Sequence, residues 1–146
     1  MEKLHFSISI KAAKEKVWHT MLDDIGYRQW AAAFYEGSYY KGDWALGSKM
    51  LFLSPEDDGM VSRIVANIPY QFISIEHLGF VSKGVEDTES AGARAFAGAH
   101  ENYTFRENNG YTEVLVDTDS PEEYKGMFED MWPKALALLK ALSEGQ

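Results

Sequence analysis

The stretch HENYTFRENNGYTEVLVDTDSPEEYKGMFEDMWPKALALLKAL, residues 100–142, contains the pattern that decides the fold. Asn109-Gly110 is a dipeptide preferred in two-residue β-hairpin turns, so residues 100–106 and 111–117 are expected to pair as antiparallel strands. From Tyr124 to Leu142 apolar residues then recur every three or four positions, which is the spacing of one helix face. The stretch predicts a hairpin followed by a long amphipathic helix.

The start of this helix is indicated by the sequence Ser120-Pro121-Glu122-Glu123. Ser120 is a favourable N-cap, proline is preferred at the first helical position, and Glu123 is placed to complete a capping box. Pro133 falls inside the same helix and is expected to kink it, because proline lacks the backbone N–H and its ring crowds the preceding turn.

Upstream of the hairpin, the order of elements follows from periodicity. Residues 4–10 alternate apolar and polar side chains, as a strand with one buried face does. Helical spacing then predicts short helices over residues 12–23 and 26–34. The second helix presents three rings on one face, namely Tyr27, Trp30 and Phe34.

Turn residues divide the middle of the chain into four further strands, over residues 38–41, 48–54, 60–67 and 70–79. Ile68-Pro69 is expected to be a two-residue break between the last two. Residues 80–98 are too long for a simple connection, and we expect a mobile flap. The whole order predicts an α+β domain, residues 1–146, in which one helix packs on one antiparallel sheet.

Charge narrows the classes of partner. The chain has 23 acidic and 14 basic residues, a formal net charge of −9 at pH 7. This charge repels phosphate backbones and anionic membrane surfaces, so we expect neither nucleic acid nor a membrane as partner. No segment approaches the roughly 18 apolar residues of a membrane span, and residues 1–7 lack the apolar stretch of a signal peptide. We therefore expect a cytoplasmic protein without membrane insertion.

The sequence also lacks the usual signatures of metal and cofactor chemistry. It contains no cysteine, so it has no disulfide, thiol nucleophile or Cys-ligated metal. Its four histidines show no HxH or HExxH spacing, and there is no GxSxG elbow, phosphate-binding glycine loop or dinucleotide fingerprint. We expect no metal and no cofactor.

Hairpin pairing assigns side chains to the two faces of the sheet. A two-residue turn at Asn109-Gly110 pairs Glu101 with Thr118, Tyr103 with Val116, Phe105 with Val114, and Arg106 with Glu113. A two-residue turn at Ile68-Pro69 pairs Met60 with His77, Ser62 with Ile75, and Ile64 with Ile73. The inner face then consists of Met50, Phe52, Met60, Ser62, Ile64, Ile73, Ile75, His77, Glu101, Tyr103, Phe105, Val114 and Val116.

His77 and Glu101 are ionisable residues on this otherwise apolar face, and both lie toward the same end of the sheet. Because side chains alternate between the two faces along each strand, a register in which they lie opposite each other is allowed. Such a pair can orient the polar end of a mostly apolar ligand, or act in proton transfer. Alternatively, it is a satisfied structural pair near the end of the sheet.

Twenty aromatic residues are available to line a cavity or to fill a core. The candidate cavity residues are Trp30, Phe34, Tyr40, Met50, Phe52, Ile64, Ile75, His77, Glu101, Tyr103, Val116, Phe128, Met131 and Trp132. Plain core packing is the alternative for the rings. On the outer face, apolar side chains are predicted at Leu51, Leu53, Val61, Val65 and Phe72. A contiguous surface of this kind favours a partner or a homodimer.

Several segments together resemble one superfamily. They are residues 10–30, the turn Trp44-Ala45-Leu46-Gly47-Ser48, Glu101-Asn102-Tyr103, and the final helix with Trp132-Pro133 and Leu136. Over essentially its full length the chain is similar to START-like, or SRPBCC, proteins, in the branch related to the activator of the heat-shock protein 90 ATPase. The resemblance implies a helix-grip fold, in which a curved antiparallel sheet wraps the final helix around an apolar cavity.

Three functions are compatible with this resemblance. The first is binding of an apolar or amphipathic small molecule between the sheet and the final helix. The second is an enzyme of cyclase, dehydratase or hydrolase type that uses the same cavity, with His77 as base and Glu101 or Tyr103 assisting. The third, ranked last, is a protein-interaction role that stimulates a chaperone ATPase.

Overall fold

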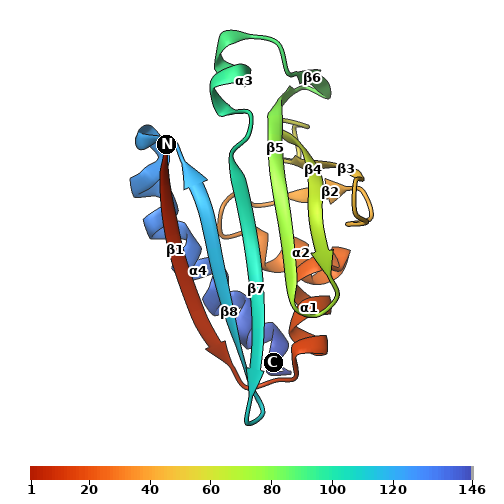
Figure 1. Ribbon diagram of the computed structural model, residues 1–146, viewed down its shortest axis with the longest axis vertical. Coiled ribbons are helices and arrows are strands. Elements are labelled where there is room, and N and C mark those ends of the chain that lie inside the picture. Colours follow the sequence, from red (N-terminus) through yellow and green to blue (C-terminus); the bar gives the residue numbers. More distant parts are fainter. Residues whose placement is uncertain (146) are drawn as a thin grey trace.

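A curved antiparallel sheet with helices against one face forms the body of the computed structural model, which describes residues 1–145 (Figure 1). The strands are β1 (Glu2–Ile10), β2 (Tyr39–Lys41), β3 (Lys49–Leu53), β4 (Gly59–Ile68), β5 (Phe72–Ser82), β6 (Val85–Asp87), β7 (His100–Asn108) and β8 (Tyr111–Ser120). The helices are α1 (Lys14–Leu22), α2 (Asp24–Ala31), α3 (Ala91–Phe96), the 3₁₀ turn η1 (Glu122–Tyr124) and α4 (Lys125–Ser143).

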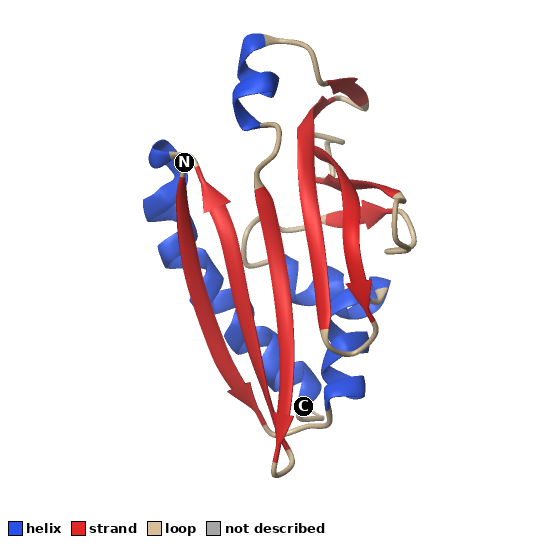
Figure 2. Ribbon diagram, in the orientation of Figure 1, coloured by secondary structure: helices blue, strands red, loops and turns tan. Residues whose placement is uncertain are grey.

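The strand order is β1-β8-β7-β5-β4-β3-β2, and β6 pairs with β5. Figure 2 shows the helices gathered behind the sheet, whose front face is left uncovered, while a short helix stands beyond one end. That short helix is α3. The arrangement is the α+β helix-grip fold expected from the sequence. Among residues 1–145, no helix is long and apolar enough to cross a membrane.

The final hairpin forms in the predicted register. Asn109 and Gly110 have φ of 56° and 82°, the left-handed values that a type I′ turn requires. All four predicted pairs are confirmed: Glu101 with Thr118, Tyr103 with Val116, Phe105 with Val114, and Arg106 with Glu113. The strands continue to Asn108 and from Tyr111, so the turn is two residues long.

The prediction for the β4–β5 hairpin is wrong in its turn and in its pairs. Ile68 pairs with Phe72, so the connection has three residues, and Tyr70 lies there at φ 65°. An irregularity between Ile64 and Ala66 then shifts the pairing by one residue. This shift compensates for the longer turn and keeps the predicted side chains on the inner face. The observed pairs are Ile64 with Ile75, Ser62 with His77, Val61 with Gly79, and Met60 with Phe80.

The predicted start of the final helix is also wrong. Ser120 is the last residue of β8, where it pairs with Glu2 of β1. Its buried side chain donates to the carbonyl of Pro121 instead of capping a helix. The chain passes through η1 before α4 begins at Lys125. Sheet pairing therefore overrides the local capping signal.

Residues 80–98, predicted to be a loop, contain regular structure. β5 extends to Ser82, a tight turn leads into β6, and α3 follows. Ser90 caps α3 by accepting a hydrogen bond from the N–H of Ala93 at 3.2 Å. Asp87 accepts hydrogen bonds from the N–H groups of Glu89 and Ser90 at 3.1 and 3.0 Å. Short side chain-to-backbone contacts thus shape this segment.

Aromatic side chains bind the carbonyls at the end of α1. The indole N–H of Trp30 donates to the carbonyl of Met21 at 2.9 Å. The indole N–H of Trp44 and the hydroxyl of Tyr40 both donate to the carbonyl of Leu22, at 2.9 and 2.6 Å. These contacts satisfy carbonyl groups that a helix end leaves without intrahelical partners.

The sheet has an apolar cluster on each face. The main core joins the inner face to α1, α2 and α4. A second, smaller cluster contains Leu53, Val61 and Val81, with Tyr39, Leu51 and Leu78 packed against it. Leu53 and Val61, predicted to lie on an open outer surface, are therefore buried.

A glycine substitution tests the close approach of β5 to the end of β6. A Cβ on Gly79 would lie 2.2 Å from the backbone oxygen of Asp87, which leads out of β6. We expect Gly79→Ala to lower the free energy of unfolding by about 1–3 kcal/mol, because backbone must shift to make room. Urea unfolding followed by circular dichroism measures this.

Gly126 in α4 provides the matched control, because a Cβ there meets no atom within 4 Å. Gly126→Ala should leave the protein as stable or raise its stability by up to about 1 kcal/mol, through helix propensity. Equal unfolding midpoints for Gly79→Ala and the unmodified protein would contradict the close approach of β5 and residues 87–88.

Candidate ligand-binding site

A chain of hydrogen-bonded polar side chains crosses the inner face of the sheet. Ser62 Oγ lies 2.7 Å from His77 Nδ1, and His77 Nε2 lies 3.3 Å from Glu101 Oε1. The hydroxyl of Tyr103 donates to Glu101 Oε2. One proton arrangement satisfies all three contacts: Ser62 donates to Nδ1, and Nε2–H and Tyr103 donate to the carboxylate.

Three adjacent strands position this chain. Ser62 of β4 pairs directly with His77 of β5, while Glu101 of β7 pairs with Ile75. His77 and Glu101 therefore meet on a diagonal, not directly opposite each other. The alternation of side chains along the strands correctly predicted that both lie on one face, and in the structure they are in contact.

The four hydrogen-bonded polar side chains are almost completely buried. Ser62, His77 and Tyr103 are all buried. The Glu101 side chain keeps 17 % of its surface exposed, so the carboxylate is the point at which the chain approaches solvent. A carboxylate has more acceptor sites than the two contacts described here, so Glu101 can accept a further hydrogen bond.

Two phenols next to this carboxylate are held in their neutral form. Burial, followed by the charge of Glu101 and the hydrogen bond to it, raises the pKa of Tyr103 well above its ordinary value. Burial, followed by the charges of Glu101 and Tyr40, raises the pKa of Tyr27 as well. Both phenols therefore stay protonated further into the alkaline range than an exposed tyrosine does.

Aromatic rings fill the space between the polar chain and the helices. Trp30 and Trp132 stack at 5.8 Å, and Phe34 meets Trp132 edge-on at 4.9 Å. Tyr103 contacts both indoles edge-on, at 6.5 and 6.1 Å. In this state, the rings proposed to line a cavity pack against one another.

The candidate residues other than His77 and Glu101 fall into three groups. Those buried in the main core are Trp30, Met50, Phe52, Ile64, Ile75, Tyr103, Val116 and Trp132. Phe34, Tyr40 and Phe128 are partly buried and pack against it, while Met131 is half-buried on α4. Tyr40 uses its hydroxyl on the end of α1, at the carbonyl of Leu22.

Two aromatic residues beside His77 were missed by the sequence reasoning. The ring of Phe96, from α3, stacks on His77 at 5.3 Å with a 14° angle between planes. It also stacks on Phe80 at 5.1 Å and 11°. A helix signal after Ser90 could have suggested α3, but the strand irregularity that turns Phe80 inward has no clear sequence signature.

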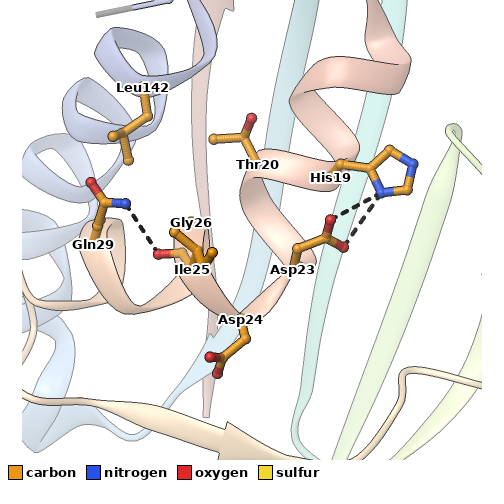
Figure 3. A pocket seen from close by; sticks show the side chains of 8 residues that line it. All are labelled: His19, Thr20, Asp23, Asp24, Ile25, Gly26, Gln29 and Leu142. Carbon is orange, nitrogen blue, oxygen red and sulfur yellow. Dashed lines mark hydrogen bonds and ion pairs between the residues drawn. The ribbon is translucent and has the colours of Figure 1, made fainter.

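Two surface hollows lie away from this chain of polar side chains. A shallow groove of about 480 Å³ lies between α1, α2 and the end of α4 (Figure 3). Its lining includes His19, which pairs with Asp23 at 3.3 Å, and Leu142. A smaller groove of about 160 Å³ lies over β1 and β8. Within the described chain, no group of three or more His, Asp and Glu side chains could hold a metal ion.

Comparison with known proteins identifies the fold. No protein-family profile matches the chain, and no curated protein sequence is significantly similar to it. The solved structures similar to it include protein MLL2253 from Mesorhizobium loti, with TM-score 0.75, 13% identity, and coverage of 97% of this chain and 96% of that one.

Two further structures extend the comparison. The Aha1 dimer from Colwellia psychrerythraea has TM-score 0.75, 17% identity, and coverage of 99% and 98%. CalU16 from Micromonospora echinospora has TM-score 0.67, 14% identity, and coverage of 98% of this chain and 76% of that one. Matches over the whole chain at such low identity show that the helix-grip fold is shared.

The raised pKa values predict how stability changes at alkaline pH. A group whose folded pKa exceeds its unfolded value stabilises the protein fully below the unfolded pKa, here about 10, and this contribution is lost as pH rises above it. We expect the free energy of unfolding to fall more steeply above pH 10 in the unmodified protein than in Tyr103→Phe. Urea unfolding from pH 8 to 11 measures the two slopes.

Tyr111→Phe, at the exposed end of the last hairpin, serves as the control and should leave the slope unchanged. If Tyr103→Phe shows the same decline as the unmodified protein, the buried phenol next to Glu101 does not produce the expected pH dependence.

Proposed function

We propose that this protein binds an apolar or amphipathic small molecule between the sheet and α4, as a START-like domain. The observation that supports this most is the buried chain of Ser62, His77, Glu101 and Tyr103 on an otherwise apolar face. Burying polar groups is unfavourable unless each has a partner, and here the last group keeps acceptor capacity toward solvent. A ligand hydroxyl or N–H satisfies that capacity.

The aromatic cluster supplies the apolar part of the proposed site. Trp30, Phe34 and Trp132 form a wall of large rings close to Tyr103. Because these rings fill the space now, ligand entry requires some of them to move. Phe34 is only partly buried, so it can move with a smaller loss of packing than the two buried indoles.

The resemblance in sequence and the shared fold support the START-like superfamily. They do not distinguish a binding protein from an enzyme, so this choice depends on the residues of the site. His77 contacts a hydroxyl on one nitrogen and a carboxylate on the other, which suits a general base. An enzyme of cyclase, dehydratase or hydrolase type is therefore the second candidate function.

The proposed protein partners rest on weaker support. One similar structure is described as the Aha1 dimer, which favours testing this chain for a homodimer by light scattering. Stimulation of a chaperone ATPase also stays a prediction. A pull-down with purified chaperone and an ATPase assay test it directly, and absence of both binding and stimulation would remove it.

The binding function is tested first by native mass spectrometry of freshly purified protein, followed by solvent extraction of whatever is bound. We expect a small molecule of defined mass at up to one equivalent, and a tenfold or greater loss of its affinity in Glu101→Gln. Glu113→Gln is the matched control, because Glu113 is an exposed carboxylate on β8. It should bind as the unmodified protein does.

Two results would count against binding. One is an empty protein that also shows no thermal stabilisation by 1-decanol or 2-naphthol. The other is equal loss of the extracted molecule in Glu101→Gln and Glu113→Gln. Turnover of the extracted molecule, abolished in His77→Gln, would instead favour the enzyme.

A further inference from the structure

Three rings form a parallel stack at the end of the polar chain. The ring of Phe96 lies 5.1 Å from Phe80 and 5.3 Å from His77, with angles between planes of 11° and 14°. Both neighbours are nearly parallel to Phe96, and no ring contact joins Phe80 to His77 among the described aromatic pairs. These distances and angles fit an arrangement in which Phe80 and His77 lie on the two faces of the Phe96 ring, so that Phe96 fills a flat slot between them.

The walls of this slot belong to one strand. His77 and Phe80 are three residues apart on β5, so in a regular strand they would point to opposite faces. The pairing shifts between Val61 and Ser62, so that His77 pairs with Ser62 and Phe80 pairs with Met60. This extra residue on β5 turns both rings to the inner face, and sheet pairing on both sides holds them there.

The ring inside the slot comes from a separate and smaller element. α3 has six residues and stands beyond the end of the sheet, apart from α1, α2 and α4 (Figure 1). Its main packing partner is β5. Gly98, at φ 92°, follows α3, and its N–H donates to the carbonyl of His77 at 2.9 Å. Gly98 is thus held on β5, and we expect Phe96 to leave the slot by movement of residues 88–97 while the sheet keeps its shape.

The edge of the slot is polar and acidic. His77 contacts Glu101 through Nε2 at 3.3 Å, and the partly exposed Glu101 carboxylate can accept another hydrogen bond. A donor on the ligand ring would be favoured there. A negatively charged substituent would be repelled by the same carboxylate.

We propose that the slot between Phe80 and His77 binds a planar, uncharged aromatic ring bearing a hydroxyl or N–H donor, and that Phe96 occupies it when the ligand is absent. This rests on the binding function proposed above and names the ligand class. Ligand and Phe96 compete for one space. The apparent dissociation constant therefore equals the intrinsic one divided by the fraction of protein in which the slot is open.

The probe is 2-naphthol, a planar ring system with one hydroxyl, titrated by isothermal calorimetry. We expect Phe96→Ala to bind it at least tenfold more tightly than the unmodified protein, because the competing ring is gone. Phe72→Ala is the matched control, since Phe72 lies on the same strand and is only partly buried. It should bind 2-naphthol as the unmodified protein does.

Two companion measurements address the polar edge. The anionic analogue 2-naphthoate should bind Phe96→Ala at least tenfold more weakly than 2-naphthol does. Glu101→Gln introduced into Phe96→Ala should reduce that discrimination, since the repelling charge is removed. Equal affinities of Phe96→Ala for 2-naphthol and 2-naphthoate would contradict the proposal that the Glu101 carboxylate lies at the edge of the slot.

A measurement on the unmodified protein covers the case in which Phe96→Ala does not fold. Saturating 2-naphthol should accelerate amide hydrogen exchange at Arg94 and Ala97, whose N–H groups are bonded within α3 and its ends. Unchanged or slower exchange there, with 2-naphthol bound, would show that the ring does not displace Phe96.

The outcomes separate this inference from the proposed function. If 2-naphthol binds but Phe96→Ala has no effect while Phe34→Ala increases affinity, the ligand lies in the cluster near α4. The binding function then stands and the slot is rejected. If no variant binds 2-naphthol, the slot is likewise rejected, and the extraction experiment alone decides the binding function.

Discussion

The pairing of β4 with β5 is the constraint on which the rest of the inner face depends. Their connection has three residues, and two irregularities follow along the ladder. The first restores the alternation that keeps Ile64 and Ile75 in the core. The same register places Ser62 opposite His77, and the second irregularity then turns Phe80 inward. A sheet with a regular ladder here would place different side chains against the helices.

Polar groups survive in this core because they are connected to each other. Ser62 and Tyr103 each reach a partner within the chain, and His77 reaches one from each ring nitrogen. Removing one member would leave its neighbour buried without a partner, which costs more than the hydrogen bond itself contributes. The chain therefore behaves as a unit, and its open end at Glu101 is where it is most easily extended.

Sequence reasoning succeeded where local rules decide the geometry. Asn109-Gly110 specified a turn type, and period-2 alternation placed His77 and Glu101 on one face. It failed where pairing with another strand decides. Ser120 has the ideal residues for a helix start after it, yet its pairing with Glu2 extends β8. The irregularity near Val65 and the position of Phe96 depend on contacts between segments far apart in sequence, which a single-sequence pattern does not encode.

The stacked pair of Trp30 and Trp132 also has an optical consequence. Their indole rings come from α2 and α4, and they lie 5.8 Å apart with an angle of 30° between planes. Two chromophores so close and so fixed couple electronically, which gives a circular dichroism signal that neither ring produces alone. The signal depends on both helices holding their places on the sheet. The protein thus carries an intrinsic spectroscopic reporter of its helix packing, which requires no label.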